Sequence, residues 1–198
     1  MMHYYYILNK PCNMVSQFKS SHEVPLLGNL HFNFPEGTHA IGRLDQHSEG
    51  LLLLTTNKKV TRLLFQGESP HFREYHVLVN SRVNQDQLNQ LSQGVQIRTG
   101  NEMFYTTRPC KVSLVDPPAI QFNSDYNPSE RVPHTWISIS LTEGKYHQVR
   151  KMLTAVGLKC KRLVRIRIEN LQLGNLAPGC IKELTEEEFF TGLKISNY

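Results

Sequence analysis

The residues with the clearest chemical potential lie in the stretch AIGRLDQHSEGLLLLTTN, residues 40 to 57, where charged side chains run directly into four leucines. Asp45 and Glu49 are four residues apart in it, and a pair of carboxylates can supply the acid and the base of glycoside cleavage. A structural role is the stronger alternative from residue types alone. Gly42 can adopt a positive φ, and Asp45 can cap a turn that leads into the leucine run.

Signatures of metal, nucleotide and serine-hydrolase chemistry are absent from the sequence. It contains no H-E-x-x-H, no G-x-x-x-x-G-K-[ST], no G-x-S-x-G and no G-x-G-x-x-G. Its 9 histidines lack the spacing of a metal site, and its 4 cysteines form no C-x-x-C pair. We therefore expect no metal and no cofactor. Reduced thiols, and the lack of a signal-peptide core or a membrane-spanning apolar run, indicate a cytoplasmic protein with no membrane partner.

Positive charge is concentrated in one part of the chain. The net charge is +5 and the pI is about 9.0. Between residues 144 and 168 there is no Asp or Glu, and the positive residues there are Lys145, Arg150, Lys151, Lys159, Lys161, Arg162, Arg165 and Arg167. A solvated face is one explanation of such a block. The commoner one is neutralisation of phosphates, which predicts a nucleic-acid partner.

Periodicity predicts the strands that would position these residues. Short apolar or alternating runs occur at residues 4–9, 50–56, 74–80, 103–122, 135–141 and 161–169. The run 50–56 has the pattern of a strand that is buried on both faces. In the run 74–80, Tyr75 shares a face with two valines, which taken alone is typical of a core position.

Apolar residues at helical spacing predict four helices. The first follows Asn57, the second spans residues 84–93, and the third has apolar residues at 149, 152, 153 and 156. The last begins at a capping box formed by Thr185 and Glu188. Strands and helices alternate without a regular βαβ rhythm, so we expect an α+β fold with a mixed, mostly antiparallel central sheet. No linker divides the chain, and residues 1–198 are expected to form a single catalytic domain.

Three ordered segments resemble the motifs of the pseudouridine synthases, in the branch that modifies ribosomal RNA. GRLDQHSEGLLLLT resembles the family motif G-R-L-D, which is followed by variable residues and G-L-L-L-L-T. REYHV resembles the segment with the family's essential tyrosine, and EGKYHQVRKM matches E-G-x-x-x-Q-V-R-[RK]-M. The likeness continues through KRLVRIRIENLQLGNLAPG. It implies the pseudouridine synthase fold, in which flanking helices and two subdomains border a central active-site cleft.

The resemblance also implies roles for particular residues. Asp45 would be the catalytic carboxylate, Tyr75 the aromatic residue that packs on the target uracil, and Arg150 the cation that pairs with Asp45. Arg43 would help to fill the space left by the flipped base, and Leu163 would line the uracil pocket. Further substrate contacts are expected from Lys10, Gln148, Lys151 and Arg165.

Three other features qualify the likeness. Lys10 and Pro11 resemble the family's N-terminal N-K-P motif, which supports the cleft. Arg73 and Glu74 stand where the family often has Lys-Thr before the tyrosine. The small N-terminal S4 domain is not expected, because the catalytic start lies at the N-terminus. This short form most resembles the synthase E type, which acts on large-subunit ribosomal RNA.

The family reaction breaks the bond between N1 and C1′ of a uridine, rotates the uracil and rejoins it through C5, without a cofactor. Asp45 would act as a nucleophile at the sugar or as a base toward its C2′ proton, and the sequence leaves both open. Either role needs an ionised carboxylate in a dry pocket. A neighbouring guanidinium such as Arg150 would offset the desolvation of that carboxylate.

We therefore expect a monomeric enzyme that isomerises a specific uridine in ribosomal RNA, within large-subunit (23S) RNA or a ribosome-assembly intermediate. A non-catalytic RNA-binding or ribosome-assembly factor with the same fold is the main alternative, because the basic block would serve it equally well. A glycosidase that uses Asp45 and Glu49 is the third hypothesis.

Overall fold

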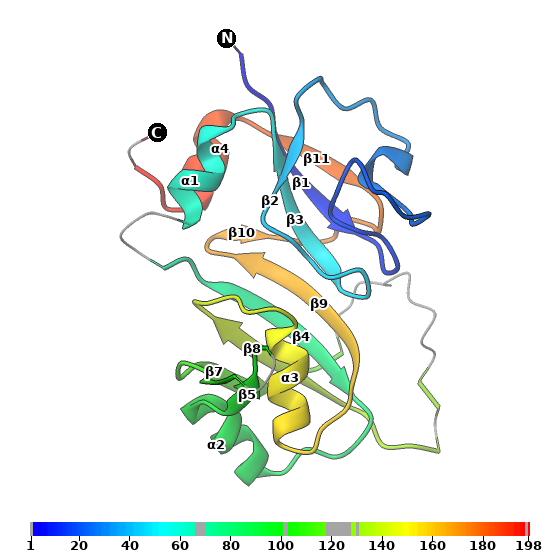
Figure 1. Ribbon diagram of the computed structural model, residues 1–198, viewed down its shortest axis with the longest axis vertical. Coiled ribbons are helices and arrows are strands. Elements are labelled where there is room, and N and C mark those ends of the chain that lie inside the picture. Colours follow the sequence, from blue (N-terminus) through cyan, green and yellow to red (C-terminus); the bar gives the residue numbers. More distant parts are fainter. Residues whose placement is uncertain (1, 66–69, 101–102, 118–127, 130, 197) are drawn as a thin grey trace.

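The computed structural model describes residues 2–65, 70–100, 103–117, 128–129, 131–196 and 198. Its main feature is a mixed sheet that runs through the whole height of the molecule (Figure 1). The strands in spatial order are β11 (Ile181–Leu184), β1 (Tyr5–Lys10), β3 (Glu49–Thr55), β9 (Cys160–Ile168), β4 (Arg73–Val79), β8 (Thr135–Leu141) and β7 (Lys111–Leu114). The short strands β2 (His39–Ile41) and β10 (Leu171–Gln172) pair with β3 and β9.

Helices flank both ends of this sheet. Two lie in the upper half of Figure 1, α1 (Lys59–Phe65) and α4 (Glu186–Gly192). Two lie in the lower half, α2 (Gln85–Gln93) and α3 (Gln148–Ala155), together with a two-stranded sheet of β5 (Gln96–Arg98) and β6 (Phe104–Thr106). Only β3 and β9 pair in parallel among the strands described. The α+β fold with a mostly antiparallel sheet is therefore confirmed.

The periodicity located most elements to within one or two residues. The capping box of Thr185 and Glu188 is formed, with the Thr185 hydroxyl accepting from the Glu188 amide at 3.1 Å. The strand expected at 103–122 is instead the two strands β6 and β7, and its last residues, 118–122, lie outside the described part of the chain. Pro109 lies between the two strands, and proline has no amide hydrogen to donate to a ladder.

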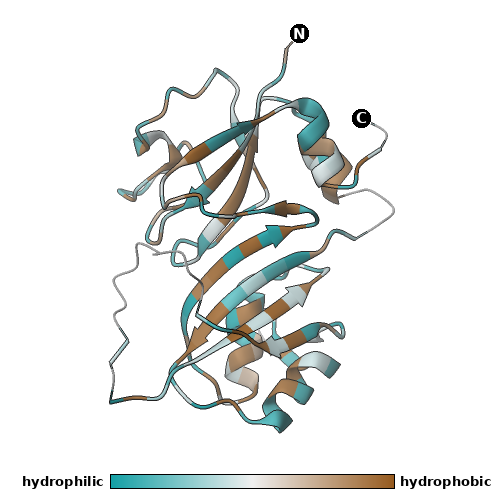
Figure 2. Cartoon of the chain, turned by 180° about the vertical axis from the view of Figure 1, so that it is seen from behind, coloured by the Kyte–Doolittle hydropathy of each residue, from teal (hydrophilic) through white to brown (hydrophobic). Residues whose placement is uncertain are grey.

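The leucine run forms β3 and is buried on both faces, as its composition predicts. Leu51 and Leu53 pack in an apolar cluster with α1 and α4, whereas Leu52 and Leu54 pack in another with residues of the segment 14–44. In Figure 2 the strands of this half are largely brown, while the long strands of the other half alternate between teal and brown. The Asp45 loop is therefore mounted on the best-buried strand.

Gly50 allows β3 to meet β9. The two strands pair over a short register, with Glu49 opposite Val164 and Gly50 opposite Arg165. Gly50 has a φ of +101°, and a Cβ there would lie 2.3 Å from the Arg165 carbonyl oxygen. Only glycine tolerates both the backbone conformation and this close approach. The contact sets the loop before β3 against the face of β9.

The loop that carries Asp45 is held at three neighbouring backbone groups. Leu44 is bonded at both its carbonyl and its amide by the buried Ser16 hydroxyl, at 2.9 and 3.0 Å. The Lys10 ammonium donates to the Gln46 carbonyl at 3.4 Å, and the Arg150 guanidinium donates to the His47 carbonyl at 2.7 Å. These contacts fix the backbone on both sides of Asp45.

Lys10 is fully buried and is bonded to backbone oxygens. Besides the Gln46 carbonyl, its ammonium donates to the carbonyls of Pro11 and Met14, at 2.7 and 2.6 Å. Burial lowers the pKa of Lys10 to about 8, although nearby Glu49 and Asp45 act in the opposite direction. These contacts agree with support of the cleft and do not place Lys10 against a substrate.

Replacement of Gly50 by alanine is expected to lower the free energy of unfolding by about 3 kcal/mol or more, because a Cβ would overlap the Arg165 backbone. Urea unfolding measures this effect. Gly37→Ala is the matched control, since Gly37 also has a positive φ of +82° but no atom within 4 Å of the added Cβ. It should cost only the conformational strain of about 1 to 2 kcal/mol. Equal losses for the two variants would contradict the overlap.

Lys10 should also leave a signature in the pH dependence of stability. Folding lowers its pKa from 10.5 to about 8, so between these values the unfolded chain binds more protons than the folded one. Its contribution to the free energy of unfolding therefore rises as the pH rises from 8 to 10.5. We expect the free energy of unfolding of the wild type minus that of Lys10→Met to become more positive by about 2 to 3 kcal/mol over this range. Chemical denaturation at several pH values measures both. A constant difference would contradict a buried, perturbed Lys10.

Candidate active site

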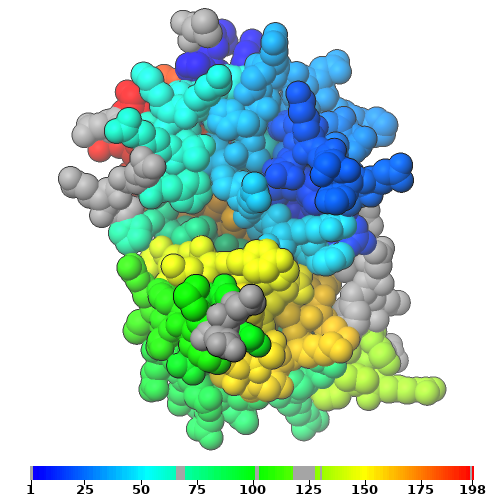
Figure 3. Space-filling model, viewed as in Figure 1, coloured from blue at the N-terminus to red at the C-terminus, as the bar shows by residue number. Residues whose placement is uncertain are grey.

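A cavity of about 580 Å³ lies where the upper and lower halves of the sheet meet. Figure 3 shows it as a hollow between the cyan segment around residues 41–65 and the yellow segment around residues 141–149. The lining comes from the loop 41–45 with Ser48, the end of α1, the start of β4, the segment 141–149 and β9. Segments far apart in the sequence therefore converge on one cleft.

The GRLD motif lines the cavity at all four of its residues. Leu44, between Arg43 and Asp45, is only 6% exposed and also packs in an apolar cluster with side chains of β1 and β3. The Asp45 side chain is 31% exposed, and its Oδ1 lies 3.5 Å from Nε2 of His147. The buried leucine thus fixes the direction in which the two charged neighbours point.

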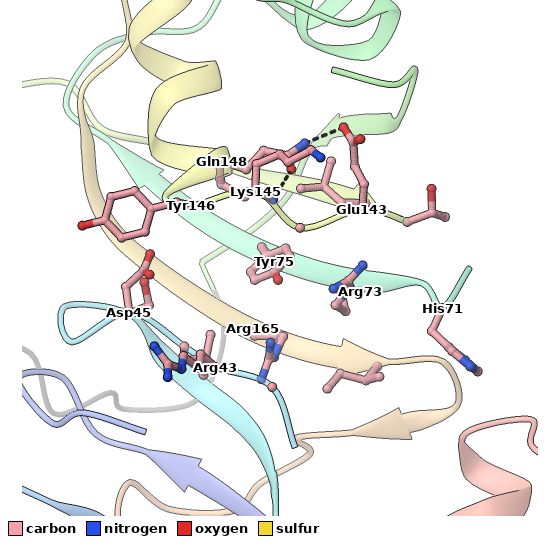
Figure 4. Close-up of a pocket in the computed structure, with 18 of the residues that line it drawn as sticks. Arg43, Asp45, His71, Arg73, Tyr75, Glu143, Lys145, Tyr146, Gln148 and Arg165 are labelled. Carbon is pink, nitrogen blue, oxygen red and sulfur yellow. Dashed lines mark hydrogen bonds between the residues drawn. The ribbon is translucent and has the colours of Figure 1, made fainter. Parts of the chain in front are cut away.

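Tyr75 lies near the middle of the cavity, on β4. It is opposite Arg165 of β9, and two residues further along β4 Val77 is opposite Leu163. The Tyr75 ring packs between two apolar clusters, and Leu163, 4% exposed, lines the same cavity. Figure 4 shows Asp45, Tyr75 and Arg165 around one space, each from a different segment.

Arg165 is a buried cation that lines this space. Its Nε donates to the Leu51 carbonyl at 2.7 Å, and one terminal nitrogen has no hydrogen-bond partner in the described part of the chain. Burial lowers the pKa of the guanidinium, whereas Tyr75 and Asp45 oppose that effect. Arginine stays charged in such surroundings because its ordinary pKa is so high. Asp45 therefore shares the cavity with a fixed positive charge.

Arg150 occupies a different place from the one the motif implied. It is absent from the cavity lining that the described residues define, and its guanidinium donates to the His47 carbonyl at 2.7 Å and contacts the Cys160 sulfur at 3.6 Å. The expected pairing of Arg150 with Asp45 is thus replaced by a brace on the backbone beside Asp45. Arg165, by contrast, lines the cavity together with Asp45.

Gln148 belongs to a network that shapes the loop before α3. It is 4% exposed, donates to Glu143 at 2.7 Å and accepts from the Lys145 amide at 2.8 Å. Glu143 also accepts from the Tyr105 hydroxyl and from the Arg108 amide. Polar contacts from several sides lower the pKa of Glu143 against the opposing effect of burial. Gln148 lines the cavity, but its amide is used within the loop.

Two side chains of this loop form the cavity rim. The rings of Tyr146 and His147 stack with their centroids 3.9 Å apart, and Tyr146 is 73% exposed. Lys151 lies outside the cavity lining of the described chain, with its ammonium 5.3 Å from the centre of the Tyr146 ring. His147 has a φ of 55°, an uncommon value for a residue with a side chain. No periodic pattern in the sequence singles out either ring.

Glu49 is not available for acid–base chemistry. It is 2% exposed, and Arg162 donates to its two carboxylate oxygens at 3.1 and 2.9 Å. Burial raises the pKa of Glu49, and Arg162 acts against this. The carboxylate is therefore a structural ion pair next to Gly50. A glycosidase with Asp45 and Glu49 as its two carboxyl groups is not supported.

The basic block is less exposed than its composition suggests. Arg162 is bonded to Glu49, Arg165 lies within the cavity, and Arg167 pairs with Glu74 at 3.0 Å. The lysines at 145 and 159 remain exposed. Phosphate contacts thus fall to fewer side chains than the count of charges implies.

The described residues contain no group of three or more His, Cys, Asp or Glu side chains placed to hold a metal ion. None of the helices that the structure describes is both long and apolar enough to cross a bilayer.

Known proteins match this chain over most of its length. The family described as RNA pseudouridylate synthase matches residues 4–155. "Ribosomal large subunit pseudouridine synthase E" of Xanthomonas axonopodis pv. citri is 35% identical over 174 residues, which cover 87% of this chain and 89% of the relative. "Ribosomal small subunit pseudouridine synthase A" of Escherichia coli is 30% identical over 185 residues, covering 93% and 71%.

Solved structures agree with the sequence matches. A crystal structure of a pseudouridylate synthase superposes with a TM-score of 0.74 and 26% identity, over 96% of this chain and 74% of that one. The region matched by the family, residues 4–155, includes the Asp45 loop, β4 and all of α3. With the family match, the curated relatives and the shared fold in agreement, this chain belongs to the RNA pseudouridylate synthase family.

Proposed function

We propose that this protein converts a uridine of ribosomal RNA to pseudouridine, with Asp45 as its catalytic carboxylate. The observation that supports this most directly is the convergence of Asp45, Tyr75 and Arg165 on one cavity from three separate segments. The names of the relatives support ribosomal RNA as the substrate class. The similarity to synthase E favours large-subunit RNA, free or within an assembly intermediate, as the substrate of a monomeric enzyme.

The target nucleotide must leave its helix before the reaction can begin. Extrusion costs roughly a few kcal/mol, because the base loses its stacking and pairing. Stacking on an aromatic side chain returns about 1 to 3 kcal/mol, and Tyr75 presents its ring in the cavity for that purpose. Arg43, exposed at the cavity edge on the same loop as Asp45, is placed to enter the gap that the base leaves.

Asp45 would then act on the sugar, as nucleophile at C1′ or as base toward the C2′ proton. Either step requires the ionised carboxylate, and the buried guanidinium of Arg165 supplies a fixed positive charge within the same cavity. The apolar Leu163 and Tyr75 help to keep water from the detached base. The bond from N1 to C1′ breaks and a bond from C5 to C1′ forms, so the overall reaction is an isomerisation.

Asp45→Asn is expected to reduce pseudouridine formation by about 10⁴-fold or more, because it removes the group that acts on the sugar. The assay follows tritium released from C5 of uridine-labelled ribosomal RNA, taken from a strain that lacks the gene. Asp86→Asn, which changes an exposed carboxylate in the first turn of α2, is the control and should behave as wild type. A folded Asp45→Asn enzyme with retained activity would contradict this role. Rescue of a ribosome-assembly defect by that variant would favour a non-catalytic RNA-binding factor.

Arg165 and Arg150 should differ in their effect on the rate. Arg165→Gln is expected to slow tritium release about 100-fold or more, because it removes the fixed charge beside Asp45. Arg150→Gln should slow it by less than about 10-fold, since it loses one hydrogen bond to a backbone carbonyl. Circular dichroism checks that each variant is folded, and Arg165→Lys, which keeps the charge, should retain more activity than Arg165→Gln. The reverse order of effects would restore Arg150 as the catalytic cation.

A further inference from the structure

We propose that Arg73 is a specificity-determining residue that binds the carbonyl groups of the uracil before and after the base rotates. This inference rests on the proposed function. It assigns a role to the residue that lines the cavity two positions before Tyr75.

Arg73 lies at the opposite end of the cavity from Asp45. Alternation along β4 places Arg73 and Tyr75 on one face, with Arg73 opposite Ile168 and Tyr75 opposite Arg165. The Asp45 loop leads into β3 at Glu49, and Glu49 lies opposite Val164 of β9. The loop therefore meets β9 near Val164, whereas Arg73 meets it four residues further along, at Ile168. Figure 4 shows Tyr75 between Asp45 and Arg73. A uracil on Tyr75 with its ribose at Asp45 would direct its far edge toward Arg73.

Two guanidinium groups in this cavity have unused donors. Nε of Arg73 and a terminal nitrogen of Arg165 are buried and have no hydrogen-bond partner among the described residues. The carboxylates near Arg73 are bonded elsewhere: Glu74 accepts from Ser138 and pairs with Arg167, and Glu143 belongs to the loop network. Unpaired buried donors are costly, so a ligand that supplies acceptors at these positions is favoured. Because arginine has only donors, the matching ligand edge must carry acceptors.

Uracil presents such acceptors in both orientations that the reaction requires. A half-turn about the axis through N3 and C6 exchanges N1 with C5, and it also exchanges the C2 carbonyl with the C4 carbonyl. The two oxygens therefore return to the same two positions after the rotation. Arg73 and Arg165 can hold the base by the same contacts in substrate and product. Cytosine carries an amino group at C4, so a hydrogen-bond donor of the base would face a donor of the arginine.

The charge on the detached base strengthens these contacts. When the bond from N1 to C1′ breaks, its electron pair stays with the uracil and is spread over N1 and the carbonyl oxygens. After C5 bonds to C1′, the C5 proton is lost and N1 takes up a proton, so the balance needs no oxidant or reductant. Hydrogen bonds between a cation and an anion are stronger than those between neutral groups. Arg73 would thus keep the uracil anion from leaving the cavity.

The test compares Arg73→Gln with Arg167→Gln in the full chain. Arg167 lies on the adjacent strand β9, pairs with Glu74 and is absent from the described cavity lining, which makes it the matched control. The probe is ribosomal RNA from the deletion strain, labelled at C2 of its uridines with carbon-14. Single-turnover reactions measure both the pseudouridine formed and the free uracil released.

We expect Arg73→Gln to slow pseudouridine formation by about 10- to 100-fold, the loss typical of one hydrogen bond to a charged group, and to release free uracil that wild type retains. Arg167→Gln should stay within about 3-fold of wild type. Wild-type rate and no free uracil in Arg73→Gln would overturn the proposal, as would equal slowing in both variants. If Arg73→Gln does not fold, Arg73→Met is compared with Arg167→Met by the same criteria.

The two proposals fail in different ways. Failure of the proposed function appears as a wild-type protein that forms no pseudouridine. Failure of the Arg73 inference appears as an active wild type with an Arg73→Gln variant that is just as active and loses no uracil.

Discussion

The cavity depends on the approach of β3 to β9 at Gly50 and Arg165. The backbones are so close that no side chain fits at Gly50, and Nε of Arg165 donates to the Leu51 carbonyl at 2.7 Å. One strand carries the Asp45 loop at its start, and the other carries the guanidinium that shares the cavity with Asp45. A shift of one residue in this parallel register would turn the opposite face of β9 toward the loop. The short contact is therefore the point from which the geometry of the site follows.

Rigidity around Asp45 comes from groups that are themselves costly to bury. Lys10, Arg165 and Glu49 are all less than 5% exposed. Burial lowers the pKa of Lys10 and of Arg165 and raises the pKa of Glu49, which in each case favours the neutral form. Apolar residues of similar volume often stabilise a fold better than such charges do. What these charges add is direction, because each hydrogen bond ends on a particular backbone oxygen or on Arg162. A carboxylate that must meet one atom of a sugar benefits from that precision more than from extra stability.

The sequence predicted the strands and helices better than it predicted the tertiary contacts between them. Periodicity located β3, β4, α3 and β9, since local burial patterns decide whether a segment alternates by two or by 3.6 residues. Resemblance supplied Asp45, Tyr75 and Leu163, and the structure places all three at one cavity. It misplaced Arg150, because a motif fixes neighbours along the helix and not the face that meets β3. Strand alternation placed Arg165 beside Leu163, but only the order β3, β9, β4 shows that this face lines the cavity.

The arginines of the cavity explain how RNA binding and chemistry can be coupled. Burial lowers the pKa of Arg165, and the positive charge of Arg73 acts in the same direction, as expected for two guanidinium groups that repel each other within one cavity. Arg43 and Arg108 add two more guanidinium groups to the lining. A nucleotide brings a phosphate to the rim and, during the reaction, an anionic base to the interior, and both relieve this repulsion. The stabilisation grows as negative charge develops on the uracil, so part of the binding energy appears only when the glycosidic bond breaks. A cavity lined by several guanidinium groups is thus suited to a state in which negative charge develops on the base.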